Sequence, residues 1–279
     1  MAPITVTSRS KSIKSDVYDN VSSYEQFIEQ VSKKNKNLSI YRIRVTDVNK
    51  KVISTTAELL NAGEVQLKDL GPQIGWRTVY LIEYAGPLIF HYLAYQLFGR
   101  PIDYDLLYKM QIFHYAKREV ENVLVHKFSN STMPLFNLFK NCGHYWILGS
   151  SLALMYGDWG NFTIPGWNPT KGNTTQYIFY FWCFAQFFNA VSHIQLRLLG
   201  EKTIRMGRAR KAPEGGFFEI YIAPNYTFEI YGWICVFLMN PNIFSLVFLT
   251  VGAVQMYFWS QKKNAKYGTN KSFLIPFVL

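Results

Sequence analysis

The sequence predicts a mainly α-helical polytopic membrane protein with about six transmembrane helices, preceded by a small α+β domain. Residues 1–70 are polar and mixed in charge, whereas residues 77–260 contain long apolar runs rich in Phe, Tyr and Trp. A helix of about 20 apolar residues crosses the hydrocarbon core of a bilayer. The mean hydropathy of −0.01 averages these two segments and hides the division. We therefore expect one domain over 1–70 and a second over 71–279.

The first 70 residues contain one amphipathic helix pattern between strand patterns. The stretch SSYEQFIEQVSKKN predicts a helix capped by Ser22 or Ser23, with Lys33 and Lys34 in its last turn. The stretches TVTSR, SIYRIRVT, KKVISTT and EVQLKDLG predict strands. One helix among several strands in so short a domain favours a ubiquitin-like β-grasp fold.

The apolar half divides into candidate spans separated by proline or by charged loops. Pro101 separates the first two spans, Pro241 separates the last two, and the short third span suggests a tilted or partly interfacial helix. The predicted spans are 77–98, 103–121, 142–157, 176–198, 217–240 and 242–260.

Loop charges predict the orientation of these spans. Basic residues gather in 109–140, in 199–216 and after 261, whereas the loop 158–175 has Lys171 alone. Because cytosolic loops carry the excess of Lys and Arg, both termini are expected in the cytosol. Asn161 in NFT and Asn173 in NTT then become candidate glycan sites on the luminal side.

Composition argues against several other classes of protein. The formal net charge of +11 is distributed over the gaps between apolar runs, which disfavours a nucleic-acid-binding face. The 3 cysteines all fall in apolar runs without metal-ligand spacing, so neither a metal site nor a disulfide framework is expected. A Rossmann GxGxxG after a strand, a P-loop, GxSxG and HExxH are all absent from the sequence. A nucleotide cofactor would therefore bind outside a Rossmann fold.

Two polar features fall in the first two spans. Glu83 lies inside the first, where a carboxylate is costly and is either functional or a structural partner of Arg77 or another basic residue. The second lies in FHYAKREVENVLVHKFS, where polar residues share one helical stripe. That stripe faces either the cytosol or a polar cavity, and it comprises residues 115, 118, 119, 122 and 126.

Two further features lie near the C-terminus. The segment 192–218 combines a basic cluster with a Gly pair, which suits either a phosphate-rich ligand or a cytosolic loop. The stretch APNYTFEIYGW, residues 223–233, places Asn225, Tyr226, Thr227 and Glu229 beside a long apolar run. Pro224 fits the first turn of a helix, and that helix would hold the amide, phenol and carboxylate within about one turn.

These stretches resemble a known family. GPQIGWRTVYLIEYAGPL, HKFSNSTMPLFNLFKNC, APNYTFEIYGW and the ending LIPFVL resemble the trans-2-enoyl-CoA reductases of very-long-chain fatty-acid elongation, in the steroid 5-alpha-reductase superfamily. The resemblance covers nearly the whole chain, including the ubiquitin-like domain. It implies reduction of the 2,3-double bond of an acyl-CoA with NADPH, at the endoplasmic reticulum membrane. The implied partners are very-long-chain enoyl-CoA, membrane lipid and components of the elongase complex.

The resemblance also implies roles for residues that match the family motifs. Tyr226 matches the tyrosine that is catalytic in the family, and Glu83 matches an essential acidic residue. Lys117 and Arg118 match the KR pair of the family, which is expected to order the pocket. Tyr115 and His126, on the same helical stripe, are expected to contact the substrate. The expected cofactor contacts are Asn225, Glu229, Arg197, Arg208, Arg210, Lys211, Tyr267 and Lys271.

The tail departs from the family pattern. The segment KYGTNKSFLIPFVL is about seven residues shorter than is usual, and Lys271 takes the place of an Arg. A cofactor contact from the missing segment is therefore not expected. Two alternatives stay open: a steroid or polyprenol reductase of the same superfamily, and a non-catalytic membrane adaptor that uses its ubiquitin-like domain to bind partners.

Overall fold

The computed structural model describes residues 3–128, 131–168, 173–205 and 212–276, with side chains omitted for 202–205. The chain forms two compact units. The first comprises Met1–Thr78 with Ser129–Phe139, and the second comprises Val79–Phe128 with Lys140–Leu279. Each unit is described by itself below.

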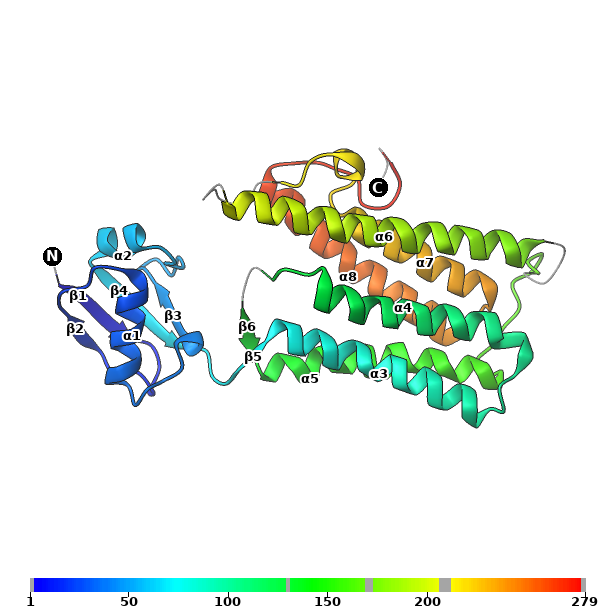
Figure 1. Ribbon diagram of the computed structural model, residues 1–279, viewed down its shortest axis with the longest axis horizontal. Coiled ribbons are helices and arrows are strands. Elements are labelled where there is room, and N and C mark those ends of the chain that lie inside the picture. The colour runs from blue at the N-terminus through cyan, green and yellow to red at the C-terminus, as the bar shows by residue number, and fades with distance from the viewer. Residues whose placement is uncertain (1–2, 129–130, 169–172, 206–211, 277–279) are drawn as a thin grey trace. The chain divides into compact units, whose positions relative to one another are not determined.

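The first unit is built on a 4-stranded sheet with both parallel and antiparallel strand pairs (Figure 1). Its strand order is β2-β1-β4-β3, with β1 (Ile4–Ser8) parallel to β4 (Glu64–Asp69). The outer strands β2 (Asp16–Tyr18) and β3 (Ile43–Thr46) are antiparallel to β1 and β4, respectively. The short 3₁₀ turn η1 (Ile40–Arg42) leads into β3. A separate ladder pairs β5 (Gln73–Gly75) with β6 (Thr132–Pro134).

The predicted amphipathic helix is confirmed as α1 (Tyr24–Lys34). The Ser23 side chain accepts a hydrogen bond from the Gln26 backbone N–H, which satisfies one of the free donors of the first turn. Phe27, Ile28 and Val31 are buried in one apolar cluster with the inward side chains of the sheet. The unit therefore has a hydrophobic core of its own.

The strand predicted over KKVISTT is wrong. Val52 makes only an isolated bridge to Thr46, and the chain then enters α2 (Thr56–Ala62). The physical reason is a capping box, in which the Thr55 side chain accepts from the Glu58 N–H and the Glu58 carboxylate accepts from the Thr55 N–H. This Ser/Thr-x-x-Glu signal is readable in the sequence and indicates a helix start.

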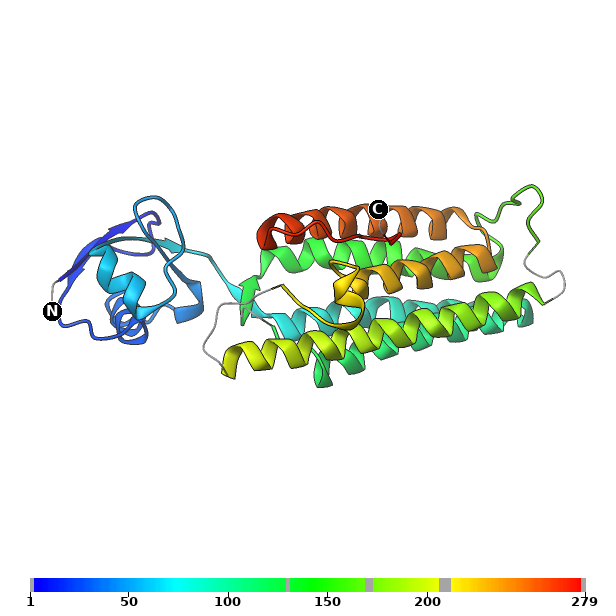
Figure 2. The same ribbon diagram turned by 90° about the horizontal axis from the view of Figure 1, so that it is seen from above.

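Helices make up the second unit, and its long helices lie side by side (Figures 1 and 2). They correspond to the predicted spans, and the ends of the spans 77–98 and 103–121 agree to within three residues. The helix predicted over 176–198 ends instead at Arg205, the one over 217–240 begins at Pro224, and the one over 242–260 ends at Tyr267. Short 3₁₀ turns precede two of them, η2 (Ile102–Tyr104) before α4 and η5 (Gly216–Glu219) before α7. The long helices are α3 (Trp76–Leu97), α4 (Asp105–Leu124), α6 (Thr174–Arg205), α7 (Pro224–Met239) and α8 (Ile243–Tyr267).

The third predicted span is an irregular helical run. It begins as α5 (Phe136–Cys142), continues as the π-helix η3 (Gly143–Gly149) and ends as the 3₁₀ helix η4 (Leu152–Gly157). Within it, Trp146 packs against α3 so closely that a Cβ on Gly86 would lie 2.4 Å from the indole. The Trp146 indole N–H also donates to the Ile82 carbonyl at 2.8 Å. Glycine at position 86 therefore permits this close approach.

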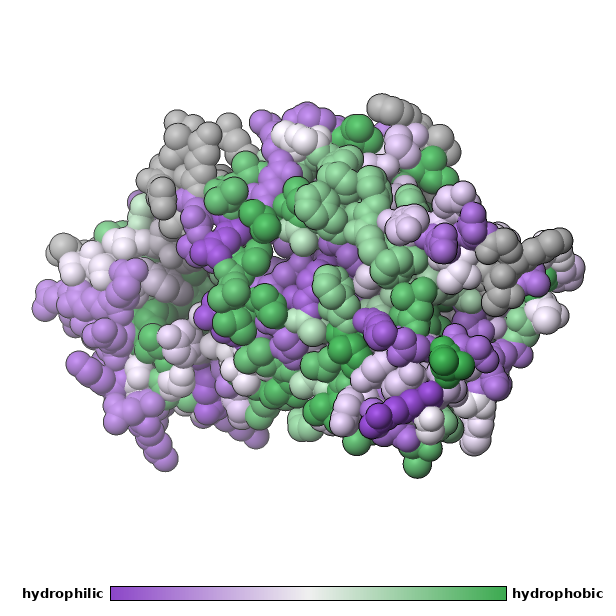
Figure 3. Space-filling view, turned by 45° about the vertical axis from the view of Figure 1, so that its right-hand side comes forward, coloured by the Kyte–Doolittle hydropathy of each residue, from purple (hydrophilic) through white to green (hydrophobic). Residues whose placement is uncertain are grey.

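Large apolar side chains are exposed on several helices of the second unit. Among the described helices, Ile243–Tyr267 alone is long and apolar enough by composition to count as a membrane span. Hydrophobic side chains are contiguous over much of the face in Figure 3. The exposed large apolar residues include Ile89, Phe90 and Leu93 on α3, Phe181, Phe184 and Phe187 on α6, and Val247, Val251 and Val254 on α8. Exposed patches of this size on several helices are typical of a lipid- or partner-facing surface.

Candidate active site

The start of α7 carries the polar residues that stood out in the sequence. Pro224 occupies the first turn, where its missing N–H is not needed, as predicted. Thr227 is buried and its hydroxyl donates to the Phe273 carbonyl at 2.6 Å. The other three polar side chains of this turn, those of Asn225, Tyr226 and Glu229, make no such hydrogen bond to the described part of the tail, residues 268–276. Their contacts define the candidate site.

Asn189 on α6 connects this turn to the rest of the bundle. Its amide N–H group donates to the Asn225 carbonyl at 2.8 Å and to Oε2 of Glu229 at 3.2 Å. Its side-chain oxygen accepts from the Lys117 ammonium on α4. One buried amide thus links three helices, and it places Lys117 close to the carboxylate of Glu229.

Arg118 is the centre of the second half of this network. Its guanidinium donates to Oε2 of Glu121 at 2.6 Å and to the Tyr84 hydroxyl on α3 at 3.2 Å. Glu121 also lies 3.4 Å from the Lys117 ammonium, and its Oε2 lies 2.9 Å from Nδ1 of His193, which donates in the Nδ1–H tautomer. Two cations and two carboxylates, counting Glu229, therefore offset one another in the interior, as buried charges require.

The predicted stripe on α4 consequently faces the interior of the bundle and not the cytosol. Tyr115, Arg118 and Asn122 are all buried. The interpretation as a solvated amphipathic face is wrong for the centre of the stripe, because Arg118 is buried and contacts Glu121 of its own helix together with Tyr84 and His193 of neighbouring helices. Glu119 is half-buried, and its Oε2 has no hydrogen-bond partner among the described residues. His114 joins the same set, since its Nε2 lies 3.6 Å from Oε1 of Glu229. We call the connected set Tyr84, His114, Lys117, Arg118, Glu121, Asn189, His193 and Glu229 the interior polar network.

Sequence reasoning missed two members of this network on α6, Asn189 and His193, and also Gln186, whose Oε1 lies 3.3 Å from Nδ1 of His114. Gln186, Asn189 and His193 follow one another at i, i+3 and i+7 along α6, which otherwise is strongly aromatic in this region. Such spacing places all three on one helical face and is the signal that could have identified them. Glu121 could have been found in the same way, because it lies four residues after Lys117 and three after Arg118.

Tyr226 lies at the edge of the network. Arg118 and Glu229 both act electrostatically on its phenol, as does Tyr80 on α3. Its ring contacts come from α8, where Trp259 lies 6.0 Å away between centroids and the Lys263 ammonium lies 4.2 Å from the ring centroid. The Tyr226 ring therefore packs against α8, and Lys117 reaches this turn through Asn189, whereas no direct contact joins Tyr226 and Arg118 among the described residues.

Glu83 occupies a different place from the one expected. It is only 3% exposed, and its hydrogen bond goes to Asn141 rather than to a basic side chain. Its Oε1 has no hydrogen-bond partner among the described residues. Its neighbour Tyr84 contacts Arg118 and belongs to the network, but Glu83 itself does not contact Arg118 or Tyr226 in the described part of the chain. A direct role beside Tyr226 stays a prediction.

The two predicted substrate residues are both near the network. Tyr115 is fully buried and its hydroxyl has no partner among the described residues. His126 has its ring 5.0 Å from that of His193. An unsatisfied buried hydroxyl costs about 1–3 kcal/mol, so the Tyr115 hydroxyl is a candidate to meet a polar atom of a ligand.

Glu121, His126 and His193 carry the side chains that commonly bind metal ions. One ligand atom from each lies within 4.8 Å of the other two, so their spacing also resembles that of a metal site. A cationic group already fills this corner, since an Arg118 nitrogen lies 2.6 Å from Glu121 Oε2 and 2.9 Å from His193 Nδ1. Two cations at such distances repel each other. The geometry therefore favours an arginine-centred network over a metal centre.

The remaining residues expected to contact the cofactor lie in the segments after the interior polar network and in the tail. Arg197 donates to the Leu124 carbonyl and pairs with Glu201, which Lys127 also contacts at 2.8 Å. Lys271 donates to the Phe218 carbonyl at 2.5 Å, so it joins the tail to the segment before α7. Tyr267 is half-buried beside Lys266. Arg208, Arg210 and Lys211 lie outside the described residues.

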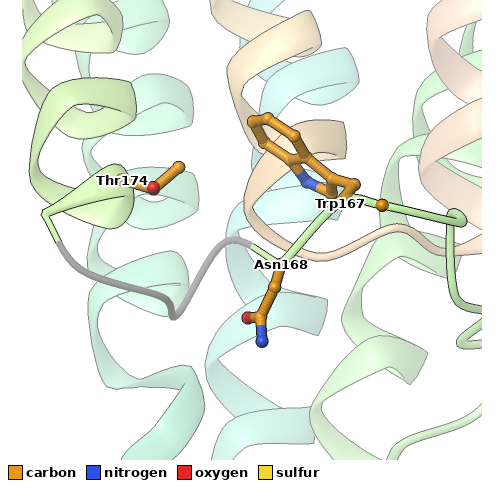
Figure 4. A pocket seen from close by; sticks show the side chains of 4 residues that line it. Trp167, Asn168 and Thr174 are labelled. Carbon is orange, nitrogen blue, oxygen red and sulfur yellow. The ribbon is translucent and has the colours of Figure 1, made fainter.

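A cavity of about 490 Å³ is lined by Gly166, Trp167, Asn168 and Thr174 (Figure 4). The Trp167 indole donates to the Leu238 carbonyl, which belongs to the last turn of α7. Tyr226 and Asn225 lie in the first turn of the same helix. This cavity is therefore separate from the interior polar network, and it contains none of the residues whose chemistry was predicted.

Comparison with known proteins identifies the family. The 3-oxo-5-alpha-steroid 4-dehydrogenase family matches residues 131–279. A putative enoyl reductase of Schizosaccharomyces pombe is 36% identical over 99% of both chains. The very-long-chain enoyl-CoA reductase of Dictyostelium discoideum is 35% identical over 76% of this chain and 73% of its own. A probable very-long-chain enoyl-CoA reductase of Caenorhabditis elegans is 35% identical over 76% of this chain and 75% of its own. The chain therefore belongs to the 3-oxo-5-alpha-steroid 4-dehydrogenase family and, within it, to the group that contains the very-long-chain enoyl-CoA reductases.

Proposed function

We propose that the protein reduces the 2,3-double bond of very-long-chain trans-2-enoyl-CoA to the saturated acyl-CoA, with NADPH as reductant. In the cell this would be the last reductive step of fatty-acid elongation. The observation that carries the proposal is the interior polar network, which converges on the one turn of α7 that holds Asn225, Tyr226 and Glu229. The names of the relatives support the same substrate class.

The nicotinamide end of NADPH fits the described residues. Oδ1 of Asn225 is buried without a hydrogen-bond partner among them, which suits the N–H₂ of a carboxamide. Arg197 and Lys271 are already engaged with carbonyl groups of the chain. The phosphates are therefore assigned to Arg208, Arg210 and Lys211, whose charge suits them.

NADPH, when bound, supplies a hydride to the β-carbon of the conjugated thioester. Negative charge then develops on the thioester oxygen, and the α-carbon gains a proton. Tyr226 is the proposed proton donor, and Arg118 is a cation whose field reaches this phenol. Asn189 holds the Glu229 carboxylate and the Asn225 backbone in position. Lys117, through Asn189, ties this turn to α4.

The substrate's two ends suit different parts of the chain. The acyl tail is apolar and is expected among the helices, with the carbonyl near the unsatisfied Tyr115 hydroxyl. The CoA head is anionic and is expected near the basic segments of the cytosolic side.

The proposal includes the membrane topology. About six helical segments, 76–97, 105–124, 136–157, 174–205, 224–239 and 243–267, would cross or enter the endoplasmic reticulum membrane, with both termini in the cytosol. The exposed apolar faces of α3, α6 and α8 support lipid contact. Asn161 donates its amide to Tyr104 and Asp158, which disfavours a glycan there and leaves exposed Asn173 as the better candidate.

The first unit is proposed to be a ubiquitin-like domain. The parallel pairing of its first and last long strands β1 and β4, flanked by antiparallel β2 and β3, with a helix after the first hairpin, agrees with a β-grasp arrangement. Components of the elongase complex are its proposed partners.

The test is an assay of the purified protein in lipid nanodiscs. A long-chain trans-2-enoyl-CoA and a 4-ene-3-ketosteroid are each offered with NADPH or NADH, and cofactor oxidation and reduced product are measured. We expect saturated acyl-CoA with NADPH, since the family match alone would also allow a steroid. Reduction of the steroid alone would assign the protein to the steroid branch. If neither substrate caused oxidation of NADPH, the result would contradict the proposal.

A further inference from the structure

Lys263 has an unusual place for a lysine. It follows Lys262 in α8, yet Lys262 is exposed whereas Lys263 is half-buried and directed at Tyr226. Its ammonium nitrogen lies 4.2 Å from the centroid of the Tyr226 ring. A cation within about 6 Å of an aromatic centroid is attracted by the negative face of the ring.

The register of α8 explains how Lys263 reaches this position. Trp259 lies four residues earlier and therefore on the same helical face. Its ring lies 6.0 Å from that of Tyr226, so α8 presents an indole and an ammonium to the same phenol. Ser260 follows Trp259, Asn264 follows Lys263, and both are buried on the adjacent face of α8. Packing of α8 thus holds Lys263 over the ring.

Other charged and titratable groups also act on this phenol. Tyr80 from α3 and Glu229 from α7 disfavour negative charge on Tyr226, and Arg118 from α4 favours it. Glu229 and Arg118 have opposite signs and both belong to the charge-balanced interior polar network. Lys263, in direct contact with the ring, adds a positive charge from the α8 side.

Building on the proposed function, we propose that Lys263 is a positioning residue for the reduction, because its ammonium holds the Tyr226 ring in place and stabilises the phenolate left after proton transfer.

The proposed step balances as follows. The hydride of NADPH carries two electrons to the β-carbon, and a thioester enolate forms as the double bond shifts. The O–H bond of Tyr226 breaks, its proton forms the new C–H bond at the α-carbon, and the electron pair stays on the phenolate oxygen. A proton from water then restores the phenol. Lys263 exchanges no atom in this sequence.

The test compares Lys263→Met with Lys263→Arg, and uses Lys262→Met as the matched control. Methionine keeps the length of the side chain without its charge, and arginine keeps the charge. We expect Lys263→Met to lower kcat about 10- to 100-fold with the KM for NADPH unchanged. The kcat of Lys263→Arg should stay within about threefold of the wild-type value. The kcat of Lys262→Met should equal the wild-type value. The alkaline limb of the pH–rate profile should move to higher pH in Lys263→Met only.

A second readout separates this inference from the proposed function. A fluorotyrosine placed at position 226 reports its own ionisation by ¹⁹F NMR without any turnover. We expect ionisation at higher pH in Lys263→Met than in Lys262→Met. Equal ionisation in the two variants, or an unchanged pH–rate profile in Lys263→Met, would overturn the role of Lys263. An inactive wild-type protein that still shows the ¹⁹F difference would contradict the proposed reaction only.

Discussion

In the first unit, Arg42 and Asp69 form a two-pronged ion pair at 2.7 and 3.0 Å near the surface, with Arg42 31% exposed. In the second unit, Arg118 and Glu121 form a 2.6 Å pair of which neither partner is more than 7% exposed. Water reaches the Arg42 side of the first pair, and Asp69, which is 9% exposed, also accepts from Ser12 and the Gly71 N–H, whereas neither side of the second pair is open to water. A buried pair whose partner is removed leaves an uncompensated charge. An arginine–carboxylate ion pair therefore joins two segments near the surface of the first unit, whereas in the second unit such a pair lies at the centre of a buried polar network.

The largest difference between the two units should follow removal of the arginine. Arg118→Met is expected to destabilise the second unit by about 3–5 kcal/mol, since Glu121 stays buried. Arg42→Met should cost about 1 kcal/mol or less. Thermal unfolding in detergent, followed by fluorescence, measures both. The double variant Arg118→Met/Glu121→Leu should recover much of the loss, and a single-variant loss below that of Arg42→Met would refute the comparison.

Buried asparagines provide a second comparison. Asn35 in the first unit donates to the Val31 carbonyl and accepts from the Lys14 N–H, and Asn189 bridges Lys117, Asn225 and Glu229. Each change to alanine should cost about 1–3 kcal/mol. We expect only Asn189→Ala to reduce turnover, by about 10- to 100-fold, because it frees Glu229 and the start of α7.

Steady-state kinetics of the two asparagine variants at matched folded fractions would decide this point. Equal turnover in both would mean that Asn189 serves stability alone.

Acid should act on the first unit mainly through the carboxylate of Asp69, since Asp16 and Glu58, whose pKa values hydrogen bonds also lower, are exposed. The Arg42 guanidinium, with hydrogen bonds from Ser12 and the Gly71 N–H, lowers the pKa of Asp69 from 3.8 to about 2. A lowered pKa in the folded state means that Asp69 contributes stability above about pH 4 and that this contribution is lost as the pH falls towards 2. The contribution is about 2 kcal/mol at most.

Urea unfolding of residues 1–78, which keep the Gly71 N–H, measures the effect across this pH range, because the hydrophobic core of the unit lies within them. Asp69→Asn should flatten the dependence between pH 4 and 2. Asp16→Asn is the control, since the ion pair of Asp16 with Lys34 is nearly half exposed on both sides. A dependence that persists in Asp69→Asn would assign the acid sensitivity to another group.

Local signals predicted much of the fold. The cap at Ser23, Pro224 in a first turn, and the breaks near Pro101 and Pro241 all agree with the structure. These signals work because each depends on residues within a few positions along the chain. The missed helix α2 had such a signal too, in Thr55 and Glu58.

The candidate site could be predicted only in part. Tyr226, Asn225 and Glu229 lie within one helical turn, so their proximity follows from spacing. The contacts of Arg118 with His193 and Tyr84, and of Tyr226 with Lys263, join helices far apart in sequence. Such pairs depend on how helices pack, which no local pattern specifies. Glu83 shows the converse, because this carboxylate stands out in the sequence but lies outside the interior polar network.

The most direct measurement is the turnover of Tyr226→Phe. This change removes one oxygen and leaves the ring beside Trp259 and Lys263. The matched control is Tyr231→Phe on the same helix, whose hydroxyl donates to the Leu274 carbonyl of the tail. We predict that Tyr226→Phe loses at least about 100-fold in the rate of enoyl-CoA reduction, while NADPH binding stays within about threefold. A Tyr226→Phe protein that is as active as Tyr231→Phe would contradict the assignment of Tyr226 as the proton donor.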